Sequence, residues 1–339
     1  MSKKAAFLFL SIFLVGCSLP KKRVAKTSSE ELIDSLTDPE QSYVTNSVSE
    51  SETSLSLEGD GISAFLKQDL VGIEAERWPN YGDDIQDGCI YNDTLFSFCS
   101  DGLCRVYDIN NNNLICESQL SSYNGFIPHS NAVCFGKKYI ESDPFPLLYT
   151  NVYNNYPSNK DSYGMCFVYR IIQAEQLAFE LIQVIKIGFT NDLDLWFDNS
   201  NNSSPYGNFL PRDNSLWVYL NIFGSNKTRF FRFNLPLFAT GLTEIDYVEL
   251  GQADIEEQFD TELFSYIQGG TADSGYIYAL SGFGNDSFPP FLRSINLKTK
   301  EVFSLDLSLI IGPREPEFID IYNGSLIVGT NHGLFCKLF

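Results

Sequence analysis

Six polar side chains stand at the beginning of predicted β-strands, each close before an apolar run. They are Gln86, His129, Asn131, Gln268, Glu315 and Glu317. If these strands surround one central channel, their first residues meet at one rim and form a mostly neutral hydrogen-bonding surface. A surface of this kind suits a polar ligand such as a glycan or a peptide. We therefore predict a non-catalytic binding site that comprises these six residues.

Three carboxylates at similar positions are compatible with catalysis as an alternative to binding. Asp87, Asp194 and Glu317 lie at the starts of three different predicted strands. Glycoside hydrolysis needs a carboxylic acid and a carboxylate that flank the scissile bond, and residues from different strands can supply them. The alternative function is therefore that of a glycoside-hydrolase-like enzyme. The non-catalytic interpretation is favoured because no nucleophile–base pair accompanies these isolated acids, and carboxylates at strand ends also serve to bind backbone amides.

Metal and cofactor chemistry finds little support in the sequence. The only histidines are His129 and His332, and the chain has no CxxC pair and no Cys/His cluster with ligand spacing. Gly-rich phosphate loops and GxSxG elbows are also missing. We expect no bound metal and no cofactor. His129 is expected to be a neutral channel histidine, although a role as acid, base or ligand stays open.

The charge balance limits the partners. The 339 residues carry a formal net charge of −20, with 23 Lys and Arg against 43 Asp and Glu. Such acidity repels polyphosphate, so nucleic acid is not an expected partner. Hydrophobic residues form 44% of the chain and aromatic residues 14%, which excludes a chain that is disordered throughout.

The region after residue 60 reads as all-β. Short runs of β-branched and aromatic residues alternate there with turns that contain Asn, Asp and Gly. Five segments share a strand, a turn and a second strand that closes on a triplet with a polar centre. The triplets begin at Tyr107, Tyr169, Phe233, Ile295 and Cys336. The first four recur roughly every 62 residues, as four-stranded propeller blades would. We predict a five-bladed β-propeller; six blades are the alternative, since residues 189–214 or 236–263 have room for further strands.

Particular strands can be assigned within this repeat. The fifth unit reaches Phe339 after three strands, so we expect an N-terminal strand at residues 62–70 to close the ring. The first strand of the third blade is expected at residues 192–198, where Asp194 lies. Its fourth strand is expected at residues 245–250.

The N-terminal residues predict where in the cell the protein is located. Lys3 and Lys4 precede an apolar run of 11 residues, which fits a secretory signal and is too short to span a membrane. Leu14-Val15-Gly16-Cys17 resembles the bacterial lipobox, so we expect lipidation of Cys17, with palmitate among its acyl chains. Ser18 resembles the residue that follows the cysteine in Gram-negative lipoproteins sent to the outer membrane. Whether the protein faces the periplasm or the exterior stays open.

Three segments result from this division of the chain. Residues 1–16 form the lipoprotein signal peptide, residues 17–60 the lipidated cysteine and a flexible tether, and residues 61–339 the propeller domain. The tether is rich in Ser, Thr, Glu and Lys and has almost no aromatic residues, so it has little with which to build a core.

Seven cysteines remain after Cys17, and most of them stand in apolar alternations. Cysteine behaves as a small hydrophobic residue in such surroundings, which favours buried thiols. Cys99 and Cys104 flank a short turn and are the pair for which a disulfide stays open.

Short motifs give the chain a family resemblance. His129-Ser130-Asn131, Gln268-Gly269-Gly270 and Glu315-Pro316-Glu317 resemble strand starts in a broad group of bacterial β-propeller lipoproteins, many of the Bacteroidetes type and mostly without an assigned function. The resemblance implies a propeller in the cell envelope rather than a particular activity. A third possible role, beside binding and hydrolysis, is that of a docking platform for envelope proteins.

Overall fold

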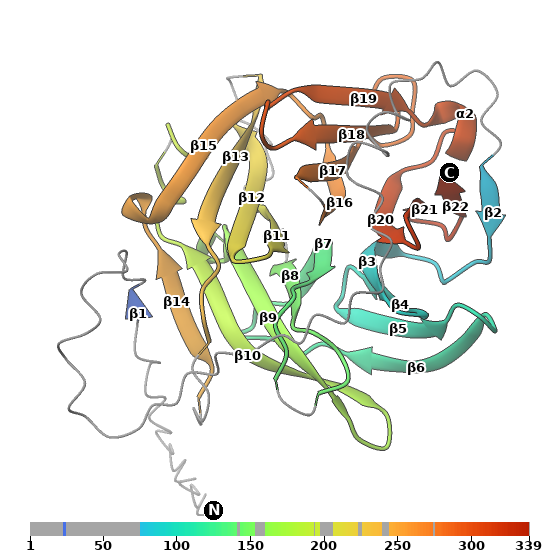
Figure 1. Cartoon of the computed structure of the whole chain (residues 1–339), viewed down its shortest axis with the longest axis horizontal. Helices are drawn as coiled ribbons and strands as arrows, with labels where there is room; N and C mark the ends of the chain where they lie inside the picture. The colour runs from blue at the N-terminus through green and yellow to red at the C-terminus, as the bar shows by residue number, and fades with distance from the viewer. Residues whose placement is uncertain are drawn as a thin grey trace, which may run out of the picture.

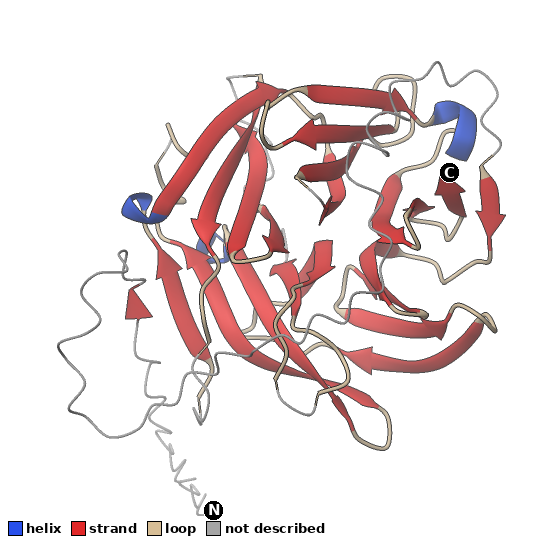
Figure 2. Cartoon of the chain, viewed as in Figure 1, coloured by secondary structure: helices blue, strands red, loops and turns tan. Residues whose placement is uncertain are grey.

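The computed structural model describes residues 23–24, 75–140, 143–152, 160–192, 194–196, 206–222, 226–238, 244–273 and 275–338. Strands dominate these ranges (Figure 2), and their helices are limited to α2 (Ser308–Ile311) and the 3₁₀ turns η1 (Lys160–Ser162) and η2 (Gln252–Asp254). The predicted signal peptide, Cys17 and nearly all of the predicted tether lie outside the described residues. No helix in the described ranges is long and apolar enough to cross a membrane.

Five antiparallel sheets surround a common centre as the blades of a propeller (Figure 1). Blade 1 consists of β3 (Ile85–Tyr91), β4 (Thr94–Cys99), β5 (Leu103–Asp108) and β6 (Asn113–Gln119). Blade 2 contains β7 (Pro128–Phe135), β8 (Leu148–Val152), β9 (Met165–Gln173) and β10 (Leu177–Ile187). Blade 3 contains β11 (Asn208–Arg212), β12 (Ser215–Ile222), β13 (Lys227–Asn234) and β15 (Ile255–Glu262). Blade 4 contains β16 (Ile267–Asp273), β17 (Tyr276–Ser281), β18 (Phe291–Asn296) and β19 (Val302–Asp306). Blade 5 contains β20 (Pro316–Tyr322), β21 (Ser325–Thr330), β22 (Phe335–Leu338) and β2 (Glu76–Trp78). The prediction of an all-β, five-bladed propeller is confirmed.

An N-terminal strand closes the ring, as predicted. It is β2, which pairs antiparallel with β22 and brings Trp78 opposite Phe335. The segment expected in this role, residues 62–70, lies outside the described residues, and β2 occupies the position for which that segment was predicted. The last blade thus contains strands from both ends of the domain. Hydrogen bonds between these strands close the ring without a covalent link.

Two strand predictions for blade 3 are wrong. Its innermost strand is β11 and not residues 192–198, whose described residues form turns rather than a strand. Its outer strand is β15, because the segment expected there, residues 245–250, corresponds to β14 (Asp246–Leu250). That strand leaves blade 3 and pairs parallel with β10 at the outside of blade 2. A further short strand, β1 (Arg23–Val24), pairs parallel with β14.

Aromatic side chains fill the space between neighbouring blades. Trp196 is fully buried and stacks on Phe231 of β13, with ring centroids 6.1 Å apart. Within blade 3, Phe230 of β13 also stacks on Phe259 of the adjacent strand β15, with ring centroids 4.8 Å apart. Trp217 is also buried, at 4% exposure, so neither of these two tryptophans offers a free face to a ligand. The buried hydrophobic residues form separate clusters, and residues of neighbouring blades share them.

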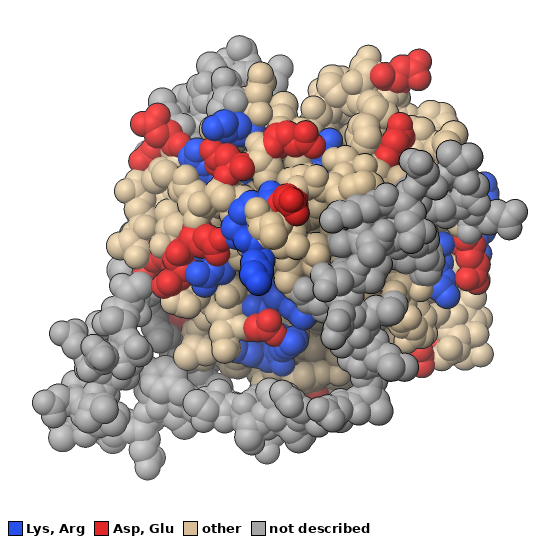
Figure 3. Space-filling model, turned by 45° about the horizontal axis from the view of Figure 1, so that its top comes forward, with Lys and Arg blue, Asp and Glu red and all other residues tan. Residues whose placement is uncertain are grey.

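Charged side chains of both signs are interspersed on the face of the molecule that Figure 3 shows. Several of them form ion pairs on blade 3, including Arg229 with Asp260 at 2.6 Å and Arg232 with Glu257 at 3.1 Å. On this face the acidic residues therefore do not gather into one uniform patch.

Candidate functional site

The innermost strands β3, β7, β11, β16 and β20 begin at one end of the propeller and lie around its centre (Figure 1). Side chains near these starts are linked from blade to blade. Nε2 of Gln268 in β16 donates a hydrogen bond to Oε1 of Glu315, which precedes β20, at 2.7 Å. Nδ2 of Asn331 donates to the other oxygen of Glu315 at 3.1 Å. Burial raises the pKa of Glu315, and the hydrogen bond from Gln268 partly offsets that effect.

A chain of amide side chains joins blades 2, 3 and 4 at the same end. Nδ2 of Asn131 donates to the carbonyl oxygen of Ile267, at 3.1 Å. The backbone nitrogen of Asn131 donates to Oδ1 of Asn151 at 2.7 Å, and Nδ2 of Asn151 donates to Oδ1 of Asn208 at 3.1 Å. Nδ2 of Asn208 in turn donates to the carbonyl oxygen of Gln268 at 2.8 Å. Because Asn131 and Gln268 are only 2% and 5% exposed, their side chains mainly hold the blades together.

Sequence reasoning missed Asn151 and Asn208. Asn208 begins the true first strand of blade 3, which was assigned to residues 192–198 instead. The signal that identifies it is the Asp-Asn turn at residues 213–214, which joins this short strand to the strongly apolar run of β12. Asn151 lies on the second strand of blade 2, where no search for first-strand residues would find it.

Asp87 is fully buried at the centre of the ring. Its carboxylate accepts hydrogen bonds from the backbone nitrogens of Val133 in blade 2, at 2.8 Å, and of Ile319 in blade 5, at 3.2 Å. Burial raises the pKa of Asp87 well above its ordinary value, although these backbone donors act in the opposite direction. Both oxygens of this side chain are thus used to join three blades.

Asp320 also joins neighbouring blades by hydrogen bonds, further along β20. Its carboxylate accepts hydrogen bonds from the backbone nitrogen of Ile90 in blade 1, at 2.6 Å, and from the hydroxyl of Thr271 in blade 4, at 3.0 Å. Burial raises the pKa of Asp320 to about 6, while the three hydrogen bonds made to it lower the value. Two carboxylates therefore connect four of the five inner strands.

Glu317 differs from these two carboxylates. It is 2% exposed, and its Oε2 atom has no hydrogen-bond partner among the described residues. Burial raises the pKa of Glu317 well above its ordinary value, and the nearby charges of Glu315, Asp87 and Asp84 raise it further. Burial and neighbouring negative charge both favour the neutral form of a carboxyl group.

The inner strands approach one another very closely at Gly269. A Cβ atom on this residue would lie 1.9 Å from the carbonyl oxygen of Glu317 and 2.8 Å from Oδ1 of Asp87. Only glycine fits there, and the contact brings the predicted residues Asp87 and Glu317 against the same point of β16. At this level β3, β16 and β20 are in direct contact.

The two remaining predicted residues of the rim are less buried. His129 is partly buried near the start of β7, and its ring lies 6.1 Å from that of Tyr206 between centroids. Burial lowers the pKa of His129 to about 4, so the imidazole is neutral at physiological pH. Gln86 is partly exposed in β3, next to Asp87.

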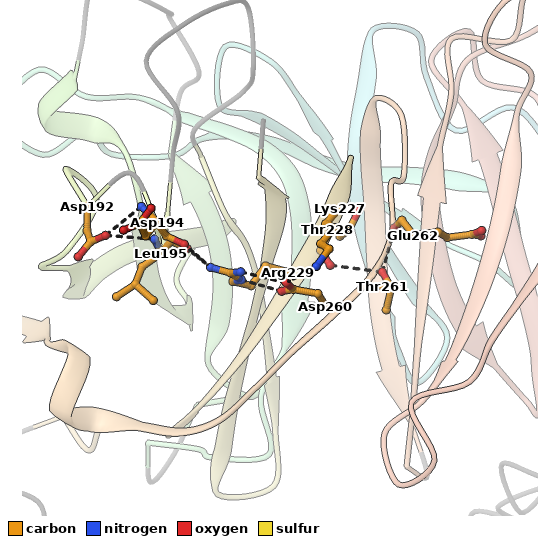
Figure 4. Close-up of polar contacts among 9 residues, drawn as sticks. All are labelled: Asp192, Asp194, Leu195, Lys227, Thr228, Arg229, Asp260, Thr261 and Glu262. Carbon is orange, nitrogen blue, oxygen red and sulfur yellow. Dashed lines mark hydrogen bonds and ion pairs between the residues drawn. The ribbon is translucent and has the colours of Figure 1, made fainter. Parts of the chain in front are cut away.

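Asp194 does not lie with the other predicted residues. It is an exposed residue of the turn before Trp196, and its backbone carbonyl accepts a hydrogen bond from Arg229 of β13, which also binds Asp260 (Figure 4). Its own backbone nitrogen donates to the side chain of Asp192 at 3.0 Å. Asp194 thus belongs to a turn beside the third strand of blade 3 rather than to an innermost strand.

An aromatic cluster that sequence reasoning missed stands beside the Gln268–Glu315 pair. It consists of Tyr266, Phe283 and Phe288. The ring centroid of Tyr266 lies 4.0 Å from that of Phe283 and 4.5 Å from that of Phe288. Tyr266 and Phe283 are each 42% exposed. Tyr266 directly precedes β16, and the other two residues lie in the loop between β17 and β18, so all three are at the end where the inner strands begin.

The backbone around this cluster is tightly constrained. Tyr266 has a φ of 54°, a conformation that an aromatic residue rarely adopts and that costs about 1 kcal/mol or more. The nitrogen of Gly282 donates to the carbonyl oxygen of Tyr266 at 2.9 Å, and Gly284 packs on the backbone of Arg314 with no room for a Cβ atom. The loop is therefore fixed against the residue before Glu315. Strain that the surrounding structure maintains is common at functional sites.

Metal binding receives no support from the described ranges, in which no three His, Cys, Asp or Glu residues are placed so that they could hold an ion. All seven cysteines within these ranges are free and buried. Burial raises the pKa of Cys104 and of Cys134 well above the ordinary value, which makes these thiols poor nucleophiles.

Comparison with known proteins finds similarity in structure and none in sequence. No protein family matches the chain by sequence, and no curated protein matches it either. Solved bacterial β-propeller proteins are similar in structure. Glutaminyl cyclase from Myxococcus xanthus is 11% identical, with a TM-score of 0.46 over 78% of this chain and 94% of its own. A putative oxidoreductase (glucose dehydrogenase) from Thermus thermophilus is 9% identical, with a TM-score of 0.44 over 79% and 100%. BamB from Moraxella catarrhalis is 8% identical, with a TM-score of 0.31 over 74% and 69%. No activity transfers to this chain at such identities.

Proposed function

We propose that the protein is a membrane-anchored, extracytoplasmic binding or scaffolding module without catalytic activity. Its anchor is the lipidated Cys17, which places it in the cell envelope at the outer membrane, and its ligand binds where the inner strands begin. The lipobox and the signal-like N-terminus support the anchor. The exposed aromatic cluster beside the Gln268–Glu315 pair supports the ligand site.

The aromatic cluster is the observation that carries the binding role. The rings of Tyr266 and Phe283 are each 42% exposed although they contact one another, and the positive φ of Tyr266 fixes one of them at the surface. Aromatic faces beside fixed amide and carboxylate groups suit the alternating C–H and hydroxyl surfaces of a sugar. A glycan is therefore the favoured ligand, and an envelope peptide or protein is the other outcome of the test.

The carboxylates give the enzyme alternative less support. Asp87 uses both oxygens in backbone hydrogen bonds between blades, and Asp194 is an exposed residue of a turn beside blade 3, away from the innermost strands. Only Glu317 keeps a buried oxygen without a hydrogen-bond partner, and a glycosidase of the usual kind needs two carboxyl groups across a substrate.

A glycan array and a peptide array, probed with the purified mature chain, test the binding role. Replacement of one ring by Phe283→Ala should weaken the strongest signal roughly 3- to 10-fold, which is the expected contribution of one aromatic contact. The matched control is Leu237→Ala, since Leu237 is another exposed apolar side chain, at 52% exposure. Equal binding by both variants and the parent, or the lack of any ligand on both arrays, contradicts the proposed site.

A further inference from the structure

The inner strands of blades 1, 4 and 5 each carry a β-bulge where they begin. In blade 5 the pairing register shifts between Pro316 and Phe318, so Glu317 is the extra residue of the bulge. Gln86 and Gln268 lie in bulges at the corresponding places of blades 1 and 4. A bulge redirects the side chain of its extra residue and is common beside functional sites. Blade 5 therefore has a carboxyl group where the other two blades have a neutral amide.

Glu317 belongs to a group of carboxylates at this end of the ring. The charges that act on it are those of Glu315, Asp87 and Asp84. In the part of the chain that the structure describes, no lysine, arginine or histidine forms an ion pair with any of these four, whereas carboxylates of blade 3 do form ion pairs. The negative charge of this group is therefore not compensated by the described residues.

Two buried acceptor atoms of the group lack a hydrogen-bond partner among the described residues. They are Oε2 of Glu317 and Oδ1 of Asn331. Because Nδ2 of Asn331 donates to Glu315, whose charge acts on Glu317, both atoms belong to one network. Buried polar atoms are rarely left without a partner, and an ammonium group brings the three donors and the positive charge that this network lacks. A metal ion is less suited, since the described ranges place no three His, Cys, Asp or Glu residues so that they could hold one.

The exposed aromatic rings are joined directly to this network. Nε2 of Gln268 donates both to Oε1 of Glu315, at 2.7 Å, and to the carbonyl oxygen of Gly282, at 3.4 Å. The nitrogen of Gly282 in turn donates to the carbonyl oxygen of Tyr266 at 2.9 Å. The faces of aromatic rings attract ammonium groups, and Tyr266 and Phe283 are each 42% exposed. Rings and carboxylates together therefore favour a ligand that is both apolar on one face and positively charged.

We infer that the ligand is a glycan that bears a free amino group, and that its ammonium binds at Glu315 and Glu317 while its ring contacts Tyr266 and Phe283. This inference rests on the proposed binding of a glycan and names the chemical class of that glycan. Glu315 is half-buried and is the carboxylate that the ligand meets first, whereas Glu317 is 2% exposed and lies deeper. Burial raises the pKa of Glu317, and a positive charge beside it favours the ionised form again.

Two sugars that differ only in charge test this inference on the purified full chain. The probes are the tetrasaccharide of glucosamine, which has free amino groups, and the tetrasaccharide of N-acetylglucosamine, in which acetylation removes their charge. Calorimetric titration at a pH below the pKa of the amine should show that the parent binds the free-amine sugar roughly 10-fold more tightly, which is the effect of one charge-assisted hydrogen bond. This comparison needs no variant and does not depend on how a variant folds. Tetralysine is a third probe, because it carries the same ammonium group on a peptide.

Glu317→Gln places in blade 5 the residue type that blades 1 and 4 have at the corresponding position, so we expect it to fold. It should remove most of the preference for the free-amine sugar and leave the affinity for the acetylated sugar unchanged. The matched control is Glu301→Gln, which removes an exposed carboxylate from the turn between β18 and β19. The control should keep the preference of the parent.

Equal affinity of the parent for the two sugars overturns the inference, as does an equal loss of preference in Glu317→Gln and Glu301→Gln. Binding of tetralysine without binding of the amino sugar overturns the assignment to a glycan. If the acetylated sugar binds as well as the free-amine sugar and Phe283→Ala weakens both, the proposed binding site stands and only the ammonium inference fails. If neither sugar binds and Phe283→Ala leaves every array signal unchanged, both fail.

Discussion

The carboxylate of Asp87 in blade 1 lies 2.8 Å from the backbone nitrogen of Val133 in blade 2 and accepts its hydrogen bond. The same side chain reaches Ile319 of blade 5, so one buried carboxylate holds its own blade to both neighbours. A propeller has no covalent closure, and contacts of this kind near the centre keep adjacent blades in register. Asp320 repeats the arrangement between blades 1, 4 and 5.

The change Asp87→Asn should lower the free energy of unfolding by about 2 kcal/mol, because the amide nitrogen turns a donor toward a backbone donor. Urea unfolding, followed by tryptophan fluorescence, measures the loss. The control is Asp194→Asn, an exposed position for which we expect a change within about 0.5 kcal/mol. Similar losses in both variants would contradict the bridging role of Asp87.

The pKa of Asp320, raised to about 6 by burial, predicts a pH dependence of stability. The folded protein binds this proton more tightly than the unfolded chain, so the contribution of Asp320 to stability falls as pH rises from about 4 to about 6. Asp320→Asn keeps the shape of the side chain and removes the titration. Its free energy of unfolding relative to the parent should therefore rise by about 1 to 2 kcal/mol across this window and level off above it. Urea unfolding from pH 4 to pH 8 checks the curve, and a difference that is flat or falls with pH rejects it.

Gly269→Ala should be severely destabilising, by about 3 kcal/mol or more, because its Cβ atom would overlap the carbonyl oxygen of Glu317. Gly251→Ala is the matched control, since its nearest neighbour lies at 3.6 Å and its φ is an ordinary −92°. Thermal unfolding of both variants separates the steric effect from the general loss of a glycine. A Gly269→Ala protein as stable as the control would show that the inner strands are not in close contact there.

The seven buried cysteines should be protected in the native state. A thiol reagent added to the native protein should react with few or none of these seven at neutral pH, and with all seven after denaturation. The expected half-time in native protein is that of unfolding, because burial raises the pKa of the thiols and excludes the reagent. Rapid reaction of one thiol without denaturant would contradict the burial of that residue, and fewer than seven on unfolding would indicate a disulfide.

The repeat in the sequence was enough to predict the class of fold and the number of blades. The closing triplets that begin at Tyr107 and Tyr169 reflect local hairpins, whose turns can be read from residues such as Asn92 and Asn323; both adopt the left-handed conformation. Blade 3 was harder because its first strand is short and contains Pro211, whereas the more aromatic run at residues 192–198 imitates a strand. The parallel pairing of β14 with β10 joins segments that are far apart in the sequence, and no local sequence pattern predicts such a contact.

The candidate site was predicted only in part. Gln268, Glu315 and Asn131 do meet where the inner strands begin, since that follows from the ring itself. Their mutual hydrogen bonds depend on how closely the inner strands approach one another. Gly269 permits the close approach, but a glycine in the sequence does not by itself predict it. Tyr266 and Phe283 were not predicted because they lie in loops. In a strand, alternation along the sequence separates buried from exposed side chains, but a loop has no such alternation.

The strand that blade 2 receives has a consequence for how the ring can come apart. Because β14 lies in the connection between β13 and β15 of blade 3 and pairs with β10 of blade 2, one stretch of chain belongs to the outer parts of both blades. Opening of blade 3 would therefore also remove a strand from blade 2, and the two blades are tied into one cooperative unit of unfolding.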